Sequence, residues 1–229
     1  LKNMVIASRD DIKAIPYHEH PALINKNQNL LFTDNGNKIP VHVFGRHNLA
    51  NINGAKQICN ELGINDKAFY KAIQTFRGAA KRLELIAENE YTSVFLDFAH
   101  APSKLKATVA ALKQKYPQRA LVAIMELHTY SSLNKAFLKN YEGTLVEAEV
   151  PIIYFNPENV KSKNMERLHI EDIKKAFNQS NLRIYKDMNT LRNDLKSCNL
   201  KNKNLLFMTS GNLGGTNIKK LATELTFLG

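Results

Sequence analysis

Cysteine is scarce and tryptophan is absent in this chain of 229 residues, whose two cysteines are Cys59 and Cys198. Two cysteines do not build the disulfide framework of a small secreted domain, and this usage is typical of a reducing compartment. Long hydrophobic runs are also missing, because no segment reaches the roughly 18 consecutive apolar residues of a membrane span. The first residues do not resemble a cleavable signal sequence. We therefore expect a cytoplasmic protein that does not act in a membrane.

The chain also lacks an arginine-rich run, although its formal net charge is +11. Such an excess of positive charge can mark a nucleic-acid-binding protein. The lysines are instead spread along predicted helices and loops, as at Lys104, Lys113, Lys174 and Lys219. We interpret them first as a solvated surface, next as a basic cleft for a phosphate-bearing small substrate, and last as a nucleic-acid surface.

A third absence concerns nucleotide chemistry. Enzymes that use nucleoside triphosphates usually carry a phosphate loop of the form G-x-x-x-x-G-K-[ST], and this sequence contains none. The β-rich N-terminal segment also starts without a helix–strand unit of its own. We therefore expect the chain to begin inside a domain whose earlier part lies elsewhere.

The pattern of apolar residues predicts two regions. The first contains strands at 3–8, 29–34 and 39–45 and helices at 47–63 and 67–76. In the second region strands and helices alternate, with strands at 82–88, 92–99, 119–126, 150–156, 182–186 and 204–211 and helices at 102–115, 134–141, 170–179, 188–197 and 217–228. Alternating elements with continuous Val, Ile and Leu runs predict an α/β fold with a mostly parallel sheet covered on both faces. We place the boundary near residues 78–82, which gives domains 1–80 and 81–229.

Polar residues follow three of the predicted strands where each strand ends. Asp97 and His100 follow one strand, and Glu126 and His128 end another. The last strand delivers Thr209, Ser210, Gly211 and Asn212. Ligands of open α/β sheets bind at the carboxyl ends of the strands, so these three groups can form one site.

Each group also has a structural interpretation, which stays open. Asp97 and His100 can simply cap the helix that begins near Pro102. His128 can be an ordinary surface histidine. The turn 210–215 can be merely flexible, or it can present backbone N–H groups to a carboxylate or phosphate.

A further polar group opens the helix at 47–63. Asn48 and Asn51 lie three residues apart, so both amides can face one side of its first turn. An amide can donate and accept at once, which suits the edge of an adenine; N-capping by Asn48 is the alternative. Arg82 lies at the domain junction, where arginine can reach a polyphosphate or form an ion pair between domains.

Three segments together resemble the Mur ligases, the ATP-dependent amide ligases of peptidoglycan synthesis. They are FGRHNLANINGA at 44–55, FRGAAKRLE at 76–84 and FLDFAHAPSKLKAT at 95–108. Their order and spacing are most similar to the branch that acts on UDP-N-acetylmuramate. The resemblance covers nearly the whole chain.

The resemblance implies that residues 1–80 are the end of a central ATP-binding domain and that residues 81–229 are a Rossmann-like C-terminal domain. Asn51, with His47 and Asn48, is then expected to hold adenine. Arg82 is expected to meet the ATP phosphates and Asp97 the ribose. His100 would line the place where ATP and the incoming amine meet, and Arg82 and His100 are the expected catalytic residues. His128 and the turn Ser210, Gly211 and Asn212 would bind the acceptor.

The implied reaction has two steps. The carboxylate of UDP-N-acetylmuramate attacks the γ-phosphate of ATP to give an acyl phosphate, with Mg²⁺ neutralising charge, and an amine then displaces phosphate. The Mg²⁺ ligands and the phosphate loop are expected upstream of this chain, so the chain alone is expected to be inactive. The C-terminal domain must close on the central domain to complete the site, so hinge motion is expected to gate turnover.

One turn of the sequence differs from the L-alanine-adding branch, and this difference bears on the identity of the acceptor. The branch that adds L-alanine tends to carry arginines after the strand at 119–126, whereas residues 126–132 contain none. A longer acceptor can place its carboxylates against lysines elsewhere. We therefore expect the tripeptide L-Ala-γ-D-Glu-meso-diaminopimelate as acceptor, with L-alanine as the alternative; the oligomeric state is not indicated.

Two unrelated functions are alternatives to this interpretation. A dinucleotide-binding oxidoreductase would need a G-x-G-x-x-G turn and an acidic residue about twenty residues later, which the early strand–helix turns lack. A basic module that binds RNA or another polyanion would show steeply salt-dependent binding. Both are weaker interpretations than a ligase.

Overall fold

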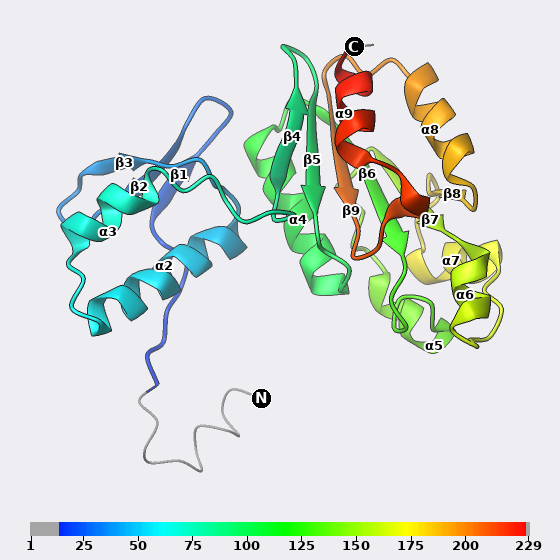
Figure 1. Cartoon of the computed structure of the whole chain (residues 1–229), viewed down its shortest axis with the longest axis horizontal. Helices are drawn as coiled ribbons and strands as arrows, with labels where there is room; N and C mark the ends of the chain where they lie inside the picture. Colours follow the sequence, from blue (N-terminus) through cyan, green and yellow to red (C-terminus); the bar gives the residue numbers. More distant parts are fainter. Residues whose placement is uncertain (1–13, 228–229) are drawn as a thin grey trace. The chain divides into compact units, whose positions relative to one another are not determined.

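The computed structural model describes residues 14–227. The chain divides into two compact units, Leu1–Arg77 and Gly78–Gly229. They run from blue to cyan and from green to red in Figure 1. The division lies close to the boundary expected after residue 80. The strand expected at 3–8 lies outside the described residues.

The first unit combines a small antiparallel sheet with two helices. Its described strands pair in the order β1 (Ala22–Ile24), β2 (Asn29–Phe32) and β3 (Lys38–Pro40). Helices α2 (Arg46–Glu61) and α3 (Asp66–Ile73) follow. Strand β1 was not expected, and β3 ends at Pro40 rather than at residue 45. The core of this unit comes from all of these segments and contains Leu31, Val41, Val43, Leu49, Ile52, Phe69 and Tyr70.

The apolar spacing of α2 predicts its buried face only in part. Leu49 and Ile52 are buried, whereas Ile58 and Leu62 are 64% and 73% exposed. At 3.6 residues per turn, six residues carry Ile58 about 240° around the helix from Ile52. The buried position that follows Ile52 is instead Lys56, which is 7% exposed.

Lys56 is held by an ion-pair network. Its Nζ lies 2.9 Å from Asp66 and 3.3 Å from Asp34, and it stands over the ring of Tyr70. Burial opposes the charged form of Lys56, but Asp66, Tyr70 and Asp34 outweigh burial and raise its pKa above the ordinary value. This lysine therefore joins the start of α3 to α2 and to the loop after β2.

The second unit is built on a mostly parallel sheet of six described strands. Their order is β4-β5-β9-β6-β7-β8, and β4 alone runs antiparallel to its neighbour. The strands are β4 (Glu84–Glu88), β5 (Ser93–Asp97), β6 (Ala120–Leu127), β7 (Val150–Phe155), β8 (Arg183–Tyr185) and β9 (Lys203–Met208). The predicted α/β fold with a mostly parallel sheet is therefore confirmed.

The helices of this unit lie on both faces of the sheet and beside its edge. They are α4 (Pro102–Lys115), α5 (Lys135–Leu138), α6 (Pro157–Ser162), α7 (Ile170–Phe177), α8 (Met188–Ser197) and α9 (Ile218–Phe227). Side chains of α8 and α9 share one apolar cluster with Val94, Ile124 and Phe207 of the strands. Neighbouring strand residues point to the opposite face, where α4 packs against β6. Helix α6 was not expected from the sequence.

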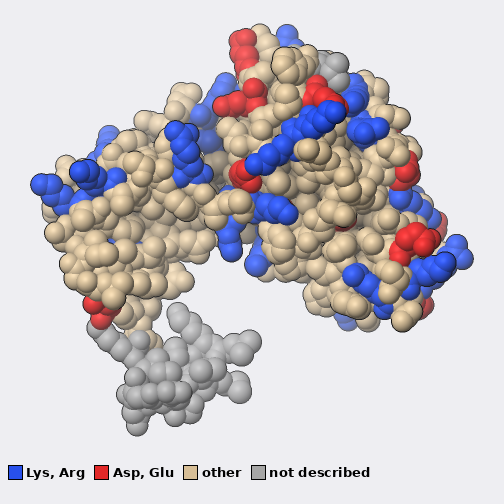
Figure 2. All heavy atoms as spheres, viewed as in Figure 1, with Lys and Arg blue, Asp and Glu red and all other residues tan. Residues whose placement is uncertain are grey.

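The parallel strands all end at one edge of the sheet, which is the lower edge in Figure 1. Helices α5 and α6 lie beside this edge. On the face shown in Figure 2, Lys and Arg atoms form separate groups divided by uncharged surface. Among the described residues, no helix has the length and apolar character needed to span a membrane.

Candidate functional site

Asp97 ends strand β5 with its carboxylate buried, at 6% exposure. One oxygen, Oδ2, accepts the backbone N–H of Leu83 at 2.7 Å, and Oδ1 accepts that of Ala99 at 2.6 Å. Helix α4 is capped instead by Ala101, which has no polar side chain. The capping interpretation of Asp97 is therefore wrong. The carboxylate shapes the two loops that carry Arg82 and His100.

Arg82 stands in a segment of unusual backbone. Its neighbours Lys81 and Leu83 have φ angles of 56° and 48°, a left-handed region that bulky residues rarely adopt. Several hydrogen bonds hold this backbone. Asp97 accepts the Leu83 N–H, Glu84 accepts the Lys81 N–H at 2.9 Å, and the Lys81 carbonyl accepts the N–H of Phe98 at 2.7 Å. The side chain of Arg82 itself is exposed. Strained backbone of this kind is typical of functional loops.

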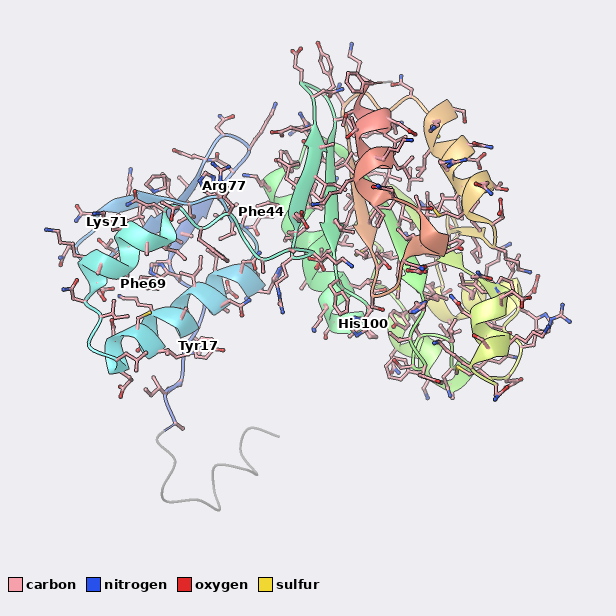
Figure 3. The ribbon with its side chains drawn as sticks, viewed as in Figure 1. Tyr17, Phe44, Phe69, Lys71, Arg77 and His100 are labelled. Carbon is pink, nitrogen blue, oxygen red and sulfur yellow. The ribbon has the colours of Figure 1, made fainter. Side chains whose placement is uncertain are left out.

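His100 has one ring nitrogen engaged. Its Nδ1 lies 3.0 Å from the carbonyl oxygen of Phe98. A carbonyl only accepts, so Nδ1 carries the hydrogen and the neutral ring keeps its lone pair on Nε2. Tyr141 fixes the backbone here, because its hydroxyl donates to the His100 carbonyl at 2.5 Å. Figure 3 labels His100 at the carboxyl edge of the sheet. Nε2 is thus available to accept a proton.

Glu126 near the end of β6 is a buried carboxylate, 1% exposed. Its Oε2 accepts the hydroxyl of Thr209 and the backbone N–H of Leu213, the latter at 3.2 Å. Thr209 in turn accepts the N–H of Gly211 at 2.9 Å, and its own N–H donates to the Asp97 carbonyl at 2.9 Å. These bonds connect the ends of β5, β6 and β9.

His128 belongs to the same cluster. Its Nδ1 lies 3.9 Å from Glu126 Oε1 and 3.2 Å from Asn159 Nδ2. The side chain is 31% exposed, so His128 is not simply a surface histidine. A Cβ at Gly211 would come within 2.6 Å of Glu126 Oε2 and 2.7 Å of His128 Cγ. Only glycine therefore allows the loop after β9 to lie against these two side chains.

The turn 210–215 is anchored rather than loose. The N–H groups of Gly211 and Leu213 donate to Thr209 and Glu126, and that of Gly215 donates to the Asn212 carbonyl at 3.0 Å. These three donors therefore do not face a ligand, in contrast to the expectation that the turn exposes its N–H groups. Ser210 offers a different group, because its buried Oγ has no hydrogen-bond partner within residues 14–227.

The remaining predicted residues lie at the start of α2 in the first unit. Asn48 is buried, and its Nδ2 donates to the Phe44 carbonyl at 2.9 Å. The N-cap of α2 is Gly45, so the capping interpretation of Asn48 is wrong. Asn51 is exposed and His47 is half-buried. Asn48 therefore supports the loop before α2, while Asn51 is the amide that faces outward.

The structure connects several residues that sequence reasoning treated separately, and it adds others. Asp97, Thr209, Glu126 and His128 form one chain of contacts. Asn159 was missed, because it lies within the unexpected helix α6, four residues after the end of β7. Within residues 14–227, no group of three or more His, Cys, Asp or Glu side chains is placed to hold a metal ion.

Comparison with known proteins identifies the family. Residues 81–211 match the profile described as "Mur ligase, glutamate ligase domain". The chain belongs to the Mur ligase family. A UDP-N-acetylmuramate–L-alanine ligase of Ruthia magnifica subsp. Calyptogena magnifica is 29% identical over 182 residues, which are 76% of this chain and 38% of the relative. This Mur ligase chain thus spans well under half of the relative's length.

Solved structures show the same fold. The UDP-N-acetylmuramate–alanine ligase MurC of Thermotoga maritima aligns with a TM-score of 0.67 at 17% identity, covering 89% of this chain and 44% of that one. The murein peptide ligase of Psychrobacter arcticus aligns with a TM-score of 0.58 at 20% identity, covering 90% and 44%. The Mur ligase fold, including the segment before residue 81, is therefore common to all three.

Proposed function

We propose that this chain supplies the C-terminal part of an ATP-dependent amide ligase of peptidoglycan synthesis or recycling. Its substrates would be UDP-N-acetylmuramate, ATP and the tripeptide L-Ala-γ-D-Glu-meso-diaminopimelate. The observation that carries the proposal is the connected polar cluster at the carboxyl edge of a Mur ligase domain, from Asp97 through Thr209 and Glu126 to His128. Ligands of open α/β sheets bind at this edge.

The chemistry proceeds in two steps. A carboxylate oxygen of UDP-N-acetylmuramate bonds to the γ-phosphorus of ATP, and ADP leaves. The amine of the acceptor then bonds to the acyl carbon, phosphate leaves, and the nitrogen gives up a proton. The lone pair on His100 Nε2 suits acceptance of that proton. Holding the two reactants in line is worth up to about 7–11 kcal/mol, so most of the catalysis would be positioning.

ATP recognition would use residues of each unit. In the first unit, Asn51 would hold adenine, with His47 beside it and Asn48 supporting the loop from within. In the second unit, Arg82 would contact the phosphates. Asp97 already accepts two backbone N–H groups, but each carboxylate oxygen has a second lone pair that can meet the ribose. Mg²⁺ bound together with ATP would neutralise charge on the phosphates.

Two features bear on the acceptor, and they point in opposite directions. The relative that is 29% identical is named for L-alanine, which favours L-alanine as the alternative acceptor. The turn from Glu126 to Ser132 contains no arginine or lysine, so it offers no cation to the carboxylate of a small amino acid. His128 and the Ser210 hydroxyl would instead meet the peptide near its reacting amine. We therefore favour the tripeptide.

The test is a ligation assay on the ligase that carries this chain together with its remaining domains. L-Alanine and the tripeptide are offered separately with ATP and UDP-N-acetylmuramate, and product and phosphate are measured. We expect ligation of the tripeptide at a far higher kcat/KM than L-alanine. A preference for L-alanine would replace the favoured acceptor by its alternative, and the absence of both products would overturn the ligase. Efficient ATP hydrolysis by the 229-residue chain alone would contradict the dependence on an upstream phosphate loop.

A further inference from the structure

A separate cavity opens beside α6, between the ends of β7 and β8. It has a volume of about 400 Å³, which lies within the range of about 300–1,000 Å³ typical of small-molecule sites. Its walls come from α6, from the loop between α6 and α7 and from the segment after β8. Its apolar lining residues are Pro157, Val160, Met165 and Leu168.

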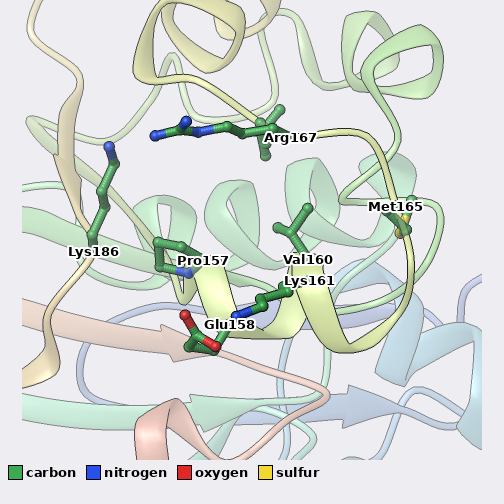
Figure 4. Close-up of a pocket in the computed structure, with 8 residues that line it drawn as sticks. Pro157, Glu158, Val160, Lys161, Met165, Arg167 and Lys186 are labelled. Atoms are coloured by element: carbon green, nitrogen blue, oxygen red, sulfur yellow. The ribbon is translucent and has the colours of Figure 1, made fainter.

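The other lining residues are charged. Lys161, Arg167 and Lys186 line the cavity together with one carboxylate, Glu158. Figure 4 shows the Arg167 and Lys186 side chains directed toward the same side of the cavity, while Lys161 extends toward Glu158. Within the described part of the chain, neither Arg167 nor Lys186 takes part in an ion pair. Two converging cations of this kind are suited to a carboxylate.

Helix α6 connects this cavity to the cluster at the strand ends. Asn159 lies between Glu158 and Val160, which both line the cavity, and its side chain contacts His128. One short helix thus presents residues to both places. A molecule whose reacting end lies near His128 can therefore extend along α6 and reach this cavity with its other end.

We propose that this cavity binds the diaminopimelate end of the tripeptide acceptor, an inference that rests on the proposed function. In that peptide the third residue carries two carboxylates and one free ammonium group. Arg167 and Lys186 would bind the carboxylates, and Glu158 would bind the ammonium group. L-Alanine has a single carboxylate, which must stay near its own reacting amine, so it has no group for this cavity. Arg167 and Lys186 are therefore specificity-determining residues.

The test uses the complete ligase and two peptides. One is L-Ala-γ-D-Glu-meso-diaminopimelate, and the other carries L-lysine in the third position, which removes one carboxylate but keeps the ammonium group. We expect the double variant Arg167→Gln with Lys186→Gln to raise KM for the diaminopimelate peptide at least tenfold. Its KM for the lysine peptide, which keeps one of the two carboxylates, should rise by a clearly smaller factor, so the preference for the diaminopimelate peptide should shrink.

A matched variant removes two other positive charges. Lys175 and Lys201 are exposed and do not line the cavity, so Lys175→Gln with Lys201→Gln should keep the preference. Circular dichroism of both variants would show whether each is folded.

The possible failures are distinguishable. If the unaltered ligase does not use the tripeptide, the proposed acceptor is wrong and the cavity proposal falls with it. If it uses the tripeptide but the cavity variant keeps a normal KM and preference, only the cavity proposal is wrong. An equal rise in KM for both peptides would also contradict it, because the cations would then not read the additional carboxylate.

Discussion

The hydroxyl of Thr209 donates to the buried carboxylate of Glu126, and the same carboxylate oxygen accepts the backbone N–H of Leu213. This relationship ties the end of β6 to the loop that follows β9. Replacement of Thr209 by valine keeps the shape and removes the hydroxyl. Since hydrogen bonds to charged groups contribute about 1.5–3 kcal/mol, we expect Thr209→Val to lower the free energy of unfolding by that amount, as measured by urea denaturation.

A matched control exists on the surface of the same unit. The Thr190 hydroxyl donates to Asp187 Oδ1 at 2.8 Å, and both residues are exposed. Thr190→Val removes the same kind of hydrogen bond, from a threonine hydroxyl to a carboxylate, at a position where water can replace it. We expect its cost to be clearly smaller than that of Thr209→Val. Equal costs at the two positions would contradict the importance assigned to the buried Glu126 carboxylate.

Gly211 is predicted to be intolerant of a side chain. A Cβ there would lie 2.6 Å from Glu126 Oε2 and 2.7 Å from His128 Cγ, so Gly211→Ala must displace one of them. Overpacking of this kind costs about 1–3 kcal/mol. We expect a lower melting temperature and, in the complete ligase, a raised KM for the acceptor. At Gly143 a Cβ would meet open space, but the φ of 69° makes a side chain strained there. Gly143→Ala should therefore lower the melting temperature while leaving the acceptor KM unchanged.

Replacement of Asp97 by alanine is expected to lower the stability of the fold, which the sequence alone does not suggest. Seen only as a ribose contact, Asp97 would be replaceable without loss of stability. In the structure it accepts the N–H groups of Leu83 and Ala99, so Asp97→Ala leaves two buried donors without partners. An unsatisfied buried group costs about 1–3 kcal/mol, and we expect a destabilisation of at least this size by urea denaturation. A fully stable variant would contradict this assignment.

Asp97→Asn separates the two roles of this residue. The asparagine keeps one carbonyl acceptor but points an NH₂ group at the second backbone donor. It should therefore be less destabilising than Asp97→Ala. In the complete ligase, a KM for ATP that rises in Asp97→Asn while kcat holds would favour a direct ribose contact. Loss of stability alone would favour a purely structural role.

The fold of the second unit was predictable because its strands are continuous apolar runs separated by helical segments. That pattern depends on the sequence alone, and it placed Asp97 and His128 at strand ends correctly. The antiparallel direction of β4 was not expected, because a short apolar run predicts a strand but not whether that strand is parallel or antiparallel to its neighbour. Helix α6 was missed because its sequence, Pro157–Ser162, has little apolar periodicity.

The positions of the polar residues at the strand ends were predictable from the sequence, but the hydrogen bonds between them were not. Strand-end reasoning brought Glu126 and Thr209 to one edge, yet their hydrogen bond depends on the loop after β9 folding back over β6. The same holds for Asn48, whose amide was expected to face adenine and instead donates to Phe44. A spacing of three residues predicts a shared helix face, and it does not predict which residue of that face becomes buried.

The last prediction concerns Lys115 at the end of α4, which is 8% exposed. Burial lowers its pKa from 10.5 to about 8, so the native state loses this proton at a lower pH than the unfolded state. Between about pH 8 and pH 10.5 the unfolded state therefore binds more protons, and stability rises with pH in that window. Below this window the buried charge costs about 3 kcal/mol at most, because a tenfold change in a proton-binding constant corresponds to about 1.36 kcal/mol.

The variant Lys115→Met removes this charge and keeps most of the side-chain volume. We expect it to unfold at a higher urea concentration than the unaltered chain at pH 7, and the difference should shrink as the pH rises toward 10.5. Burial also raises the pKa of the neighbouring Tyr116 above its ordinary value, and the Lys115 Nζ lies 5.5 Å from the centre of its ring. Because Tyr116 is present in both proteins, its own titration largely cancels in the comparison. A difference that stays constant across this range would mean that Lys115 titrates alike in the folded and unfolded chain, and its burial would then carry no electrostatic cost.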